Sequence, residues 1–225
     1  VILPAIDSAS QKDLEELATN HPNYAFATVG LHPTSVEKSW REELQFVERE
    51  LNPTRHIAIG EIGIDCYWSI EFLKEQIIVF EEQLRLASHS NLPVIIHCRN
   101  SIEHILKSLK KLKHLNIKGV FHAYSGSLES FREIEECGNF MIGIGGVVTF
   151  NGSKLQHVVK ELPLSKMLLE TDSPWLTPTP HRGERNEPSY TGLVAQKVAQ
   201  IKDCSIEEIA KTTTKNGEEL FNLST

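Results

Sequence analysis

Short apolar runs alternate with longer amphipathic stretches from one end of the chain to the other. The runs are rich in β-branched and aromatic residues without strict alternation, which is typical of parallel strands buried on both faces. They predict strands at residues 1–6, 24–30, 56–61, 93–97, 118–122, 139–144 and 167–171. Apolar residues at helical spacing predict helices at 11–20, 36–51, 72–90, 102–114, 128–137, 153–162, 188–202 and 205–220.

A strand–helix repeat of this kind fits either a doubly wound sheet or a (β/α)8 barrel. Neither GxGxxG nor GxxxxGK[ST] occurs, which weakens the nucleotide-binding doubly wound alternative. Polar residues follow several different strands at their carboxyl ends, where barrels place their chemistry. We therefore predict an α/β protein with a TIM-type barrel that forms a single domain over residues 1–225. Seven strands are expected, whereas a closed barrel has eight.

Four predicted strands run into residues that bind metals well. They are Glu61 in AIGEIGID, His97 in PVIIHCR, His122 in GVFHAYSG and Asp172 in LLETDSP. Imidazole and carboxylate together suit Zn, Mn or Fe, whereas carboxylate alone favours Mg. Each residue alone could be a hydrogen-bonded polar group at a strand end, but four such ends at one barrel mouth favour a divalent-metal site.

His32, in VGLHPTS, follows the second predicted strand on the same face of the barrel. It is either a loop cap or a site residue, and we favour the site. Tyr67, Trp68 and Tyr124 lie in neighbouring loops. They either stack on a base or sugar or cover the barrel rim.

The stretch TDSPWLTPTPHRGERNEPSY after the last predicted strand is rich in Pro and Gly, which predicts a long loop with restricted conformations. It concentrates His181, Arg182 and Arg185. Arginine forks match phosphate oxygens, and barrel phosphate sites often use this late loop. Pairing of these arginines with Glu184 or Glu187 is the simpler alternative.

Composition narrows the choice of partners. The formal net charge of −7 argues against a broad basic face for nucleic acid. No apolar run approaches the length of a membrane helix, and the chain does not open with a signal-peptide pattern. The four cysteines, Cys66, Cys98, Cys137 and Cys204, are far apart and form no CxxC, so we expect reduced thiols and a cytoplasmic protein without a membrane partner.

Taken together, VGLHP, AIGEIGID, PVIIHCR, VFHAYSG, IGIGG, LLETDSPWL and RGERNEP resemble the TatD family of metal-dependent deoxyribonucleases, in order and spacing over the whole chain. The resemblance implies a distorted TIM barrel with two divalent cations, which could be Mg, Mn or Zn. It also implies a hydrolase of ester bonds that degrades DNA from single strands or ends, without an obligate protein partner. For want of any interface signal we expect a monomer.

The resemblance also assigns roles to individual residues. Glu61 would bridge the two cations, and His97 and His122 would complete one metal site. Asp172 would bind the other cation and act as general base on the attacking water. The substrate contacts would be His32, Arg182, Arg185 and Asn186.

One departure from the family pattern stands out. The family has a first strand that carries His-x-His, two further metal ligands, and this strand is missing from the front of the sequence, which begins at Val1. We expect that this sequence begins after the family's first strand. Two alternatives stay open: an amidohydrolase-like enzyme for another ester or amide, and a catalytically inactive binding homologue. Glu61 in the bridging place favours the TatD-like interpretation, because many amidohydrolase-like relatives use a carboxylated Lys there.

Overall fold

The computed structural model describes residues 1–223, which fall into two compact units. Unit 1 comprises residues 1–119 and 136–139, and unit 2 comprises residues 120–135 and 140 onward. The predicted single domain extends to residues 224–225, which lie outside the described part. Within residues 1–223 no helix is long and apolar enough to cross a membrane.

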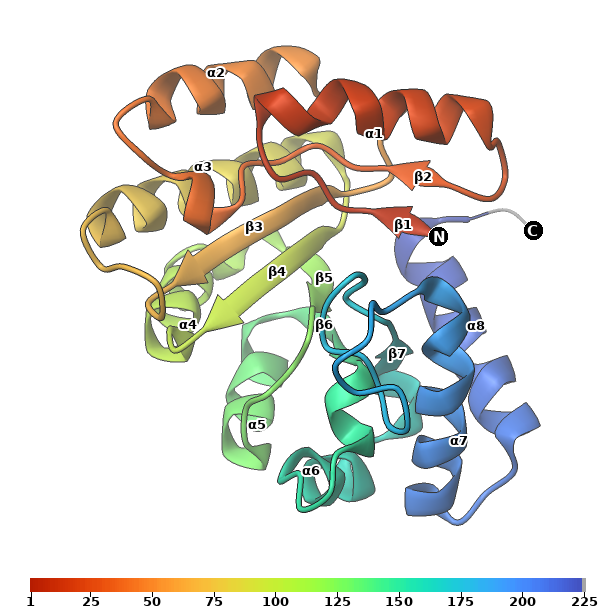
Figure 1. Cartoon of the computed structure of the whole chain (residues 1–225). Coiled ribbons are helices and arrows are strands. Elements are labelled where there is room, and N and C mark those ends of the chain that lie inside the picture. Colours follow the sequence, from red (N-terminus) through yellow and green to blue (C-terminus); the bar gives the residue numbers. More distant parts are fainter. Residues whose placement is uncertain (224–225) are drawn as a thin grey trace. The chain divides into compact units, whose positions relative to one another are not determined.

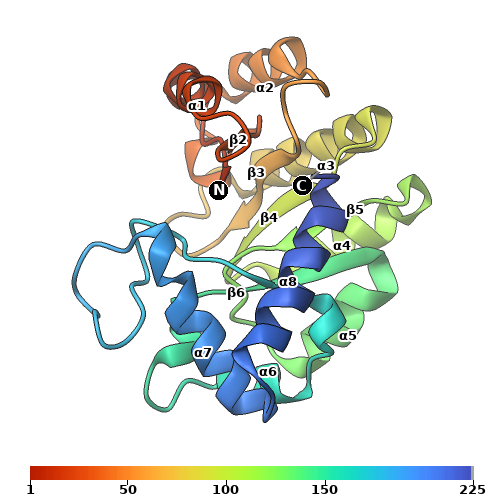
Figure 2. The same ribbon diagram turned by 90° about the vertical axis from the view of Figure 1, so that its right-hand side faces the viewer.

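Unit 1 follows the predicted alternation of strands and helices (Figure 1). Its order is β1 (Ile2–Leu3), α1 (Ser8–Asn20), β2 (Phe26–Ala27), the 3-10 turn η1 (Pro33–Ser35), α2 (Trp40–Glu50), β3 (Ile59–Asp65), α3 (Leu73–Ser90), β4 (Val94–Arg99), α4 (Ile102–Lys111), the turn η2 (Lys113–Leu115) and the first two residues of β5 (Lys118–Phe121). The pairs β1–β2 and β3–β4 are both parallel. Helices α1 and α2 lie side by side in both views (Figures 1 and 2).

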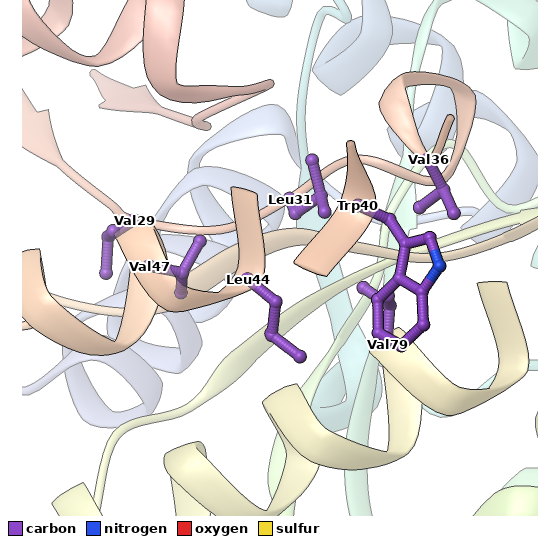
Figure 3. Packing of buried hydrophobic residues seen from close by; sticks show 7 residues of the cluster. All are labelled: Val29, Leu31, Val36, Trp40, Leu44, Val47 and Val79. Atoms are coloured by element: carbon purple, nitrogen blue, oxygen red, sulfur yellow. The ribbon is translucent and has the colours of Figure 1, made fainter. Parts of the chain in front are cut away.

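A hydrophobic cluster fixes the part of unit 1 that leads into the site (Figure 3). Helix α2 turns its apolar face inward onto the segment after β2 and onto α3, as its helical spacing predicts. The buried members are Val29, Leu31, Val36, Trp40, Leu44, Val47 and Val79. The loop that begins at residue 32 is therefore held between buried residues on both sides.

Unit 2 continues the pattern with α5 (Leu128–Cys137), β6 (Asn139–Ile144), η3 (Gly146–Thr149), α6 (Leu155–Glu161), η4 (Leu164–Lys166), β7 (Met167–Leu169), η5 (Pro188–Tyr190), α7 (Thr191–Lys202) and α8 (Ile206–Phe221). Strands β6 and β7 are parallel, with Ile142 opposite Met167 and Ile144 opposite Leu169. Helices α7 and α8 pack on each other and both contact β7 (Figures 1 and 2). The side chain of Ser205 caps α8 by accepting a hydrogen bond from the Glu208 amide at 3.1 Å.

The hydrogen-bonded strand orders are β1-β2 and β3-β4-β5-β6-β7, so the described strands follow chain order as in a βα-repeat protein. A strand lies at each of the seven predicted positions within residues 1–223, but several boundaries differ. The third strand was expected at 56–61 and spans Ile59–Asp65 instead. Its glycines and carboxylates suggest a loop, whereas all seven residues of the strand are buried. The helix expected from residue 36 begins only at Trp40, because η1 occupies the chain just before it.

Candidate metal centre

Strands β3 and β4 bring a histidine between two carboxylates. The register sets His97 on β4 opposite Gly63 on β3. Glu61 and Asp65 flank Gly63 by two residues on either side and so face the same way along the strand. His97 Nδ1 lies 2.9 Å from Glu61 Oε1, and His97 Nε2 lies 2.8 Å from Asp65 Oδ2. One imidazole thus contacts a carboxylate at each of its nitrogens.

Gly63 makes this close approach of the two strands possible. A Cβ on Gly63 would lie 2.0 Å from the carbonyl oxygen of His97, and the residue has a φ of +147°, in the region that favours glycine. Any larger residue would therefore push His97 away from its two carboxylates.

His32 completes the cluster from the loop after β2. Its ring Nε2 lies 3.3 Å from His97 Nδ1 and 3.5 Å from Glu61 Oε1. The Thr34 amide donates to His32 Nδ1 at 3.1 Å, so Nδ1 is an acceptor. In the neutral ring the proton then sits on Nε2, the nitrogen that faces Glu61 and His97. The sequence left two interpretations of His32, a loop cap and a site residue. In the structure His32 caps the loop and also lies in the cluster with Glu61 and His97.

His32, Glu61 and His97 form what we call the unit 1 centre. Each offers a ligand atom, and these atoms all lie within 4.8 Å of one another. His32 and Glu61 are buried and His97 is half-buried. Two imidazoles and a carboxylate are donors that Zn, Mn and Fe accept. The residues present therefore fit a divalent metal ion, and Asp65 is placed to orient His97 as a carboxylate partner of a metal-ligating histidine does.

The surroundings of Asp65 favour the ionised form of its carboxyl group. Burial opposes ionisation of this carboxyl, but the hydrogen bonds from His97 and from the amides of Tyr67 and Trp68 together outweigh it. The pKa of Asp65 therefore lies below its ordinary value. A carboxylate that stays ionised favours the proton on the His97 nitrogen next to it.

Unit 2 contains a second group of potential ligands, His122, Glu170 and Asp172, which we call the unit 2 group. His122 Nδ1 lies 3.3 Å from Glu170 Oε2, and its Nε2 lies 3.6 Å from Asp172 Oδ1. The Ala123 amide donates to Glu170 Oε1 at 2.6 Å. Gly143 leaves room for this carboxylate, because a Cβ there would lie 2.5 Å from Glu170 Oε2. The predicted residues His122 and Asp172 are thus neighbours.

The backbone at this group is unusual. Asp172 has a φ of +57° and Ala123 a φ of +43°, both in the left-handed region that non-glycine residues seldom adopt. Such conformations cluster at functional sites, where the surrounding structure maintains them. The Trp175 amide donates to the carbonyl of Asp172 at 2.8 Å, which closes a turn directly after the carboxylate.

The predicted substrate residues in the loop after β7 differ in how exposed they are. Arg182 is exposed, with its guanidinium carbon 4.0 Å from the centre of the Phe150 ring, and Arg185 is exposed as well. Asn186 is buried, and its amide group donates to the carbonyls of Thr171 and Trp175 at 2.6 Å each. Asn186 therefore holds the loop together, and its substrate contact stays a prediction.

The three aromatic residues also separate. Tyr67 and Trp68 are exposed and meet edge to face, with Arg99 3.8 Å above the Tyr67 ring. Tyr124 is buried, and its hydroxyl donates to the carbonyl of Ser127 at 2.6 Å. The interior position fits the covering role for Tyr124, whereas Trp68 is 70% exposed and one face of the Tyr67 ring is covered by Arg99.

Asp65 and Glu170 were not singled out from the sequence. Asp65 stands four residues after Glu61, so a strand long enough to include both would have placed them on one face. Glu170 precedes Asp172 by two residues, a spacing that also indicates a shared face in an extended segment. The strand predicted at 56–61 ends before Asp65, whereas Glu170 lies within the strand predicted at 167–171 and just beyond the end of β7 at Leu169.

The chain is similar to several known proteins. The family model "TatD related DNase" matches residues 1–222. The metal-dependent hydrolase YabD of Bacillus subtilis, named as uncharacterized, is 39% identical over 203 residues, which are 90% of this chain and 79% of YabD. The crystal structure of YjjV, a TatD homolog of Escherichia coli, is 32% identical and superposes with a TM-score of 0.89, covering 99% of this chain and 86% of YjjV.

A more distant structure bears on the fold alone. The TIM-barrel protein Bb4693 of Bordetella bronchiseptica is 12% identical and has a TM-score of 0.65, covering 98% of this chain and 76% of its own. With YjjV it confirms the predicted TIM-type fold class. The match of the family model over nearly the full length, the identity to YabD and the histidine–carboxylate cluster agree. The chain belongs to the TatD-related DNase family of metal-dependent hydrolases.

Proposed function

We propose that this protein is a metal-dependent deoxyribonuclease that hydrolyses phosphodiester bonds at single-stranded ends of DNA. The observation that carries the proposal is the unit 1 centre, in which His32, Glu61 and His97 offer ligand atoms within 4.8 Å of one another. Family membership adds the nuclease chemistry to that metal-binding geometry.

Within unit 1, Glu61 and His97 would hold a divalent cation, and within unit 2, His122 and Asp172 would hold another; Mg, Mn or Zn suits such donors. Such cations polarise a phosphoryl oxygen and acidify a bound water. Asp65 keeps His97 in orientation through the 2.8 Å contact at Nε2. Glu170 does the same for His122 through the 3.3 Å contact at Nδ1.

The remaining steps fall to side chains of this chain. Asp172 accepts the proton of the attacking water as general base. Arg182 and Arg185, both exposed, bind the non-bridging oxygens of the phosphate and stabilise the charge that develops on them. His32 Nε2, which carries the proton when Nδ1 accepts from the Thr34 amide, would donate to a phosphate oxygen at the unit 1 centre.

The acidic surface bears on how DNA is captured. With a formal charge of −7, a wide electrostatic face for duplex DNA is not available. Capture through metal ions and a few arginines at a strand end needs no such face. We propose a cytoplasmic, monomeric enzyme without a membrane partner.

The test is incubation of the full-length protein with end-labelled single-stranded DNA and Mg²⁺ or Mn²⁺. We expect stepwise shortening that EDTA abolishes. Glu61→Ala and Asp172→Asn should each lower the rate by at least about 100-fold, since each removes a metal ligand. His97→Gln should also lower the rate, and His157→Gln is its matched control, because His157 is exposed on α6, outside both candidate groups.

Two results would overturn the proposal. One is a full-length protein that leaves DNA intact with every divalent cation tried. The other is degradation that continues unchanged in Glu61→Ala and Asp172→Asn, which would point to a contaminating nuclease.

A further inference from the structure

A cavity of about 510 Å³ opens beside the unit 1 centre, between the segments 33–39 and 65–76. It shares two residues with the surroundings of that centre. Asp65 lines the cavity and also contacts His97 Nε2 at 2.8 Å, and Thr34 lines it and also contacts His32 Nδ1 at 2.7 Å. Both contacts involve the ring nitrogens that face away from the centre, so the cavity lies next to the centre, behind His97 and His32.

The walls of the cavity suit a flat ring. Trp68 and Phe72 stand on one segment, and Pro33 and Val36 on the other. Val36 belongs to the hydrophobic cluster of Figure 3, so this wall is anchored in the core. Trp68 leaves 70% of its surface exposed, which is a large apolar area for a side chain in an acidic protein to show to water. Apolar faces with hydroxyls of Thr34, Ser39 and Ser69 between them offer stacking together with edge hydrogen bonds.

The charges of the lining disfavour an anion in the cavity itself. Three lining carboxylates, Glu37, Asp65 and Glu71, outnumber the lining cation Lys38, while the Arg99 guanidinium lies 5.3 Å from the centre of the Trp68 ring. A phosphate group would be repelled there, whereas a neutral ring with donor groups at its edge meets acceptors. The occupant that fits is an uncharged heteroaromatic ring attached to a group that reaches the centre.

We propose that this cavity is a base-binding subsite, in which one nucleobase of the DNA stacks on Trp68 while the adjoining phosphodiester lies at the unit 1 centre. The inference rests on the proposed nuclease function and names the substrate element that unit 1 recognises. Tyr67 supports the wall, because it meets Trp68 edge to face at a centroid distance of 5.0 Å and carries the Arg99 guanidinium on its ring. Stacking of this kind tolerates every base, since each has a π face.

The first experiment measures binding without cleavage. The full-length protein is labelled with ¹⁵N at tryptophan and titrated in EDTA with deoxyadenosine, which has no phosphate, or with deoxyribose 5-phosphate, which has no base. Trp68→Phe identifies the Trp68 indole signal among those of Trp40, Trp68 and Trp175. We expect deoxyadenosine to shift the Trp68 signal and deoxyribose 5-phosphate to leave it in place.

The second experiment tests whether the Trp68 side chain contacts one particular base of the DNA. Affinity for fluorescent single-stranded DNA is measured in EDTA, with abasic sites placed at each position in turn. Trp68→Ala should raise the Kd roughly 5- to 100-fold, and Trp68→Phe should restore most of the affinity. One abasic position should weaken the wild type by a similar factor and have no further effect in Trp68→Ala. Ile70→Ala is the matched control, since Ile70 is 68% exposed on the same loop and does not line the cavity.

The results separate this inference from the proposed function. A Trp68 signal that no nucleoside moves, or equal affinity of Trp68→Ala and wild type for every oligonucleotide, overturns the base subsite even when the enzyme degrades DNA. Absence of DNA cleavage together with a shifted Trp68 signal overturns the nuclease proposal and leaves the base site standing.

Discussion

At the scale of single residues, the charge behind His97 comes from Asp65, whose Oδ2 lies 2.8 Å from His97 Nε2. Glu61, His97 and His32 could be named from the sequence because each follows an apolar run and carries metal-binding chemistry. Asp65 could not, because its role depends on which residue of β4 stands opposite Gly63. That register arises from packing between strands and from a glycine with positive φ, neither of which a single segment reveals.

Asp65 gives the first prediction. Asp65→Asn removes the carboxylate charge behind His97 while an amide oxygen can still accept from the Tyr67 amide, as Asp65 Oδ1 does at 2.8 Å. Loss of such a partner typically weakens a metal site by about 10- to 100-fold. We expect this loss for Zn²⁺ or Mn²⁺ in competition with a chelating dye, with the thermal midpoint of the metal-free protein changed little. Glu71→Gln removes an exposed carboxylate nearby and should leave the affinity near that of the wild type. Equal losses in the two variants would refute a positioning role for Asp65.

At the scale of elements, strand positions follow from apolar runs, but strand ends do not. The stretch GEIGID contains two glycines and two carboxylates, which by propensity suggests a loop, yet it forms the core of β3. Tertiary pairing with β4 overrides the local preference there. In contrast, the end of α3 is set locally, because Asn91 adopts the left-handed conformation that often follows a helix.

The pairing of β3 with β4 gives the second prediction. In Gly63→Ala the new Cβ would meet the His97 carbonyl oxygen at 2.0 Å, in a backbone conformation with a φ of +147°. Overpacking and backbone strain together should lower the free energy of unfolding by at least about 2 kcal/mol, as measured by urea denaturation. Metal affinity should fall as well, because His97 moves.

Gly192 supplies the control for this change. It lies near the start of α7, and a Cβ there meets nothing within 4 Å. Gly192→Ala should therefore be neutral or stabilise by up to about 1 kcal/mol. If Gly63→Ala proved as stable as Gly192→Ala, the close approach of β3 and β4 would be the wrong explanation for the glycine.

At the scale of the whole molecule, composition and the alternation of strands and helices are enough to predict the fold class. The pH dependence of stability, in contrast, can be predicted only from the structure. His56 looks unremarkable in the sequence, at the start of a predicted strand. In the structure it is buried, its Nδ1 accepts from the Asn52 amide at 3.2 Å, and its Nε2 lies 3.0 Å from Glu15 Oε1 on α1. Arg55 adds a cation beside Glu15 at 3.1 Å. A neutral imidazole that donates from Nε2 satisfies both contacts.

This pair determines how stability should respond to acid. Burial, with help from the charge of Arg55, lowers the pKa of His56 below 6.5 despite the opposing effect of Glu15. As the pH falls, His56 therefore takes up its proton in the unfolded chain before it does so in the folded protein. The free energy of unfolding should be greatest above pH 6.5 and should fall as the pH drops toward the pKa of His56 in the folded protein. The slope should be at most about 1.4 kcal/mol per pH unit. Burial opposes ionisation of Glu15, but hydrogen bonds from His56 and Gln11 and the charge of Arg55 hold its pKa below 4.5, which adds a second loss below that pH. Urea denaturation at pH 5, 6, 7 and 8 measures the slope, and His56→Gln should flatten it between pH 5 and 7 while His157→Gln should leave it as in the wild type. An unchanged slope in His56→Gln would mean that other groups, and not this buried imidazole, carry the acid sensitivity.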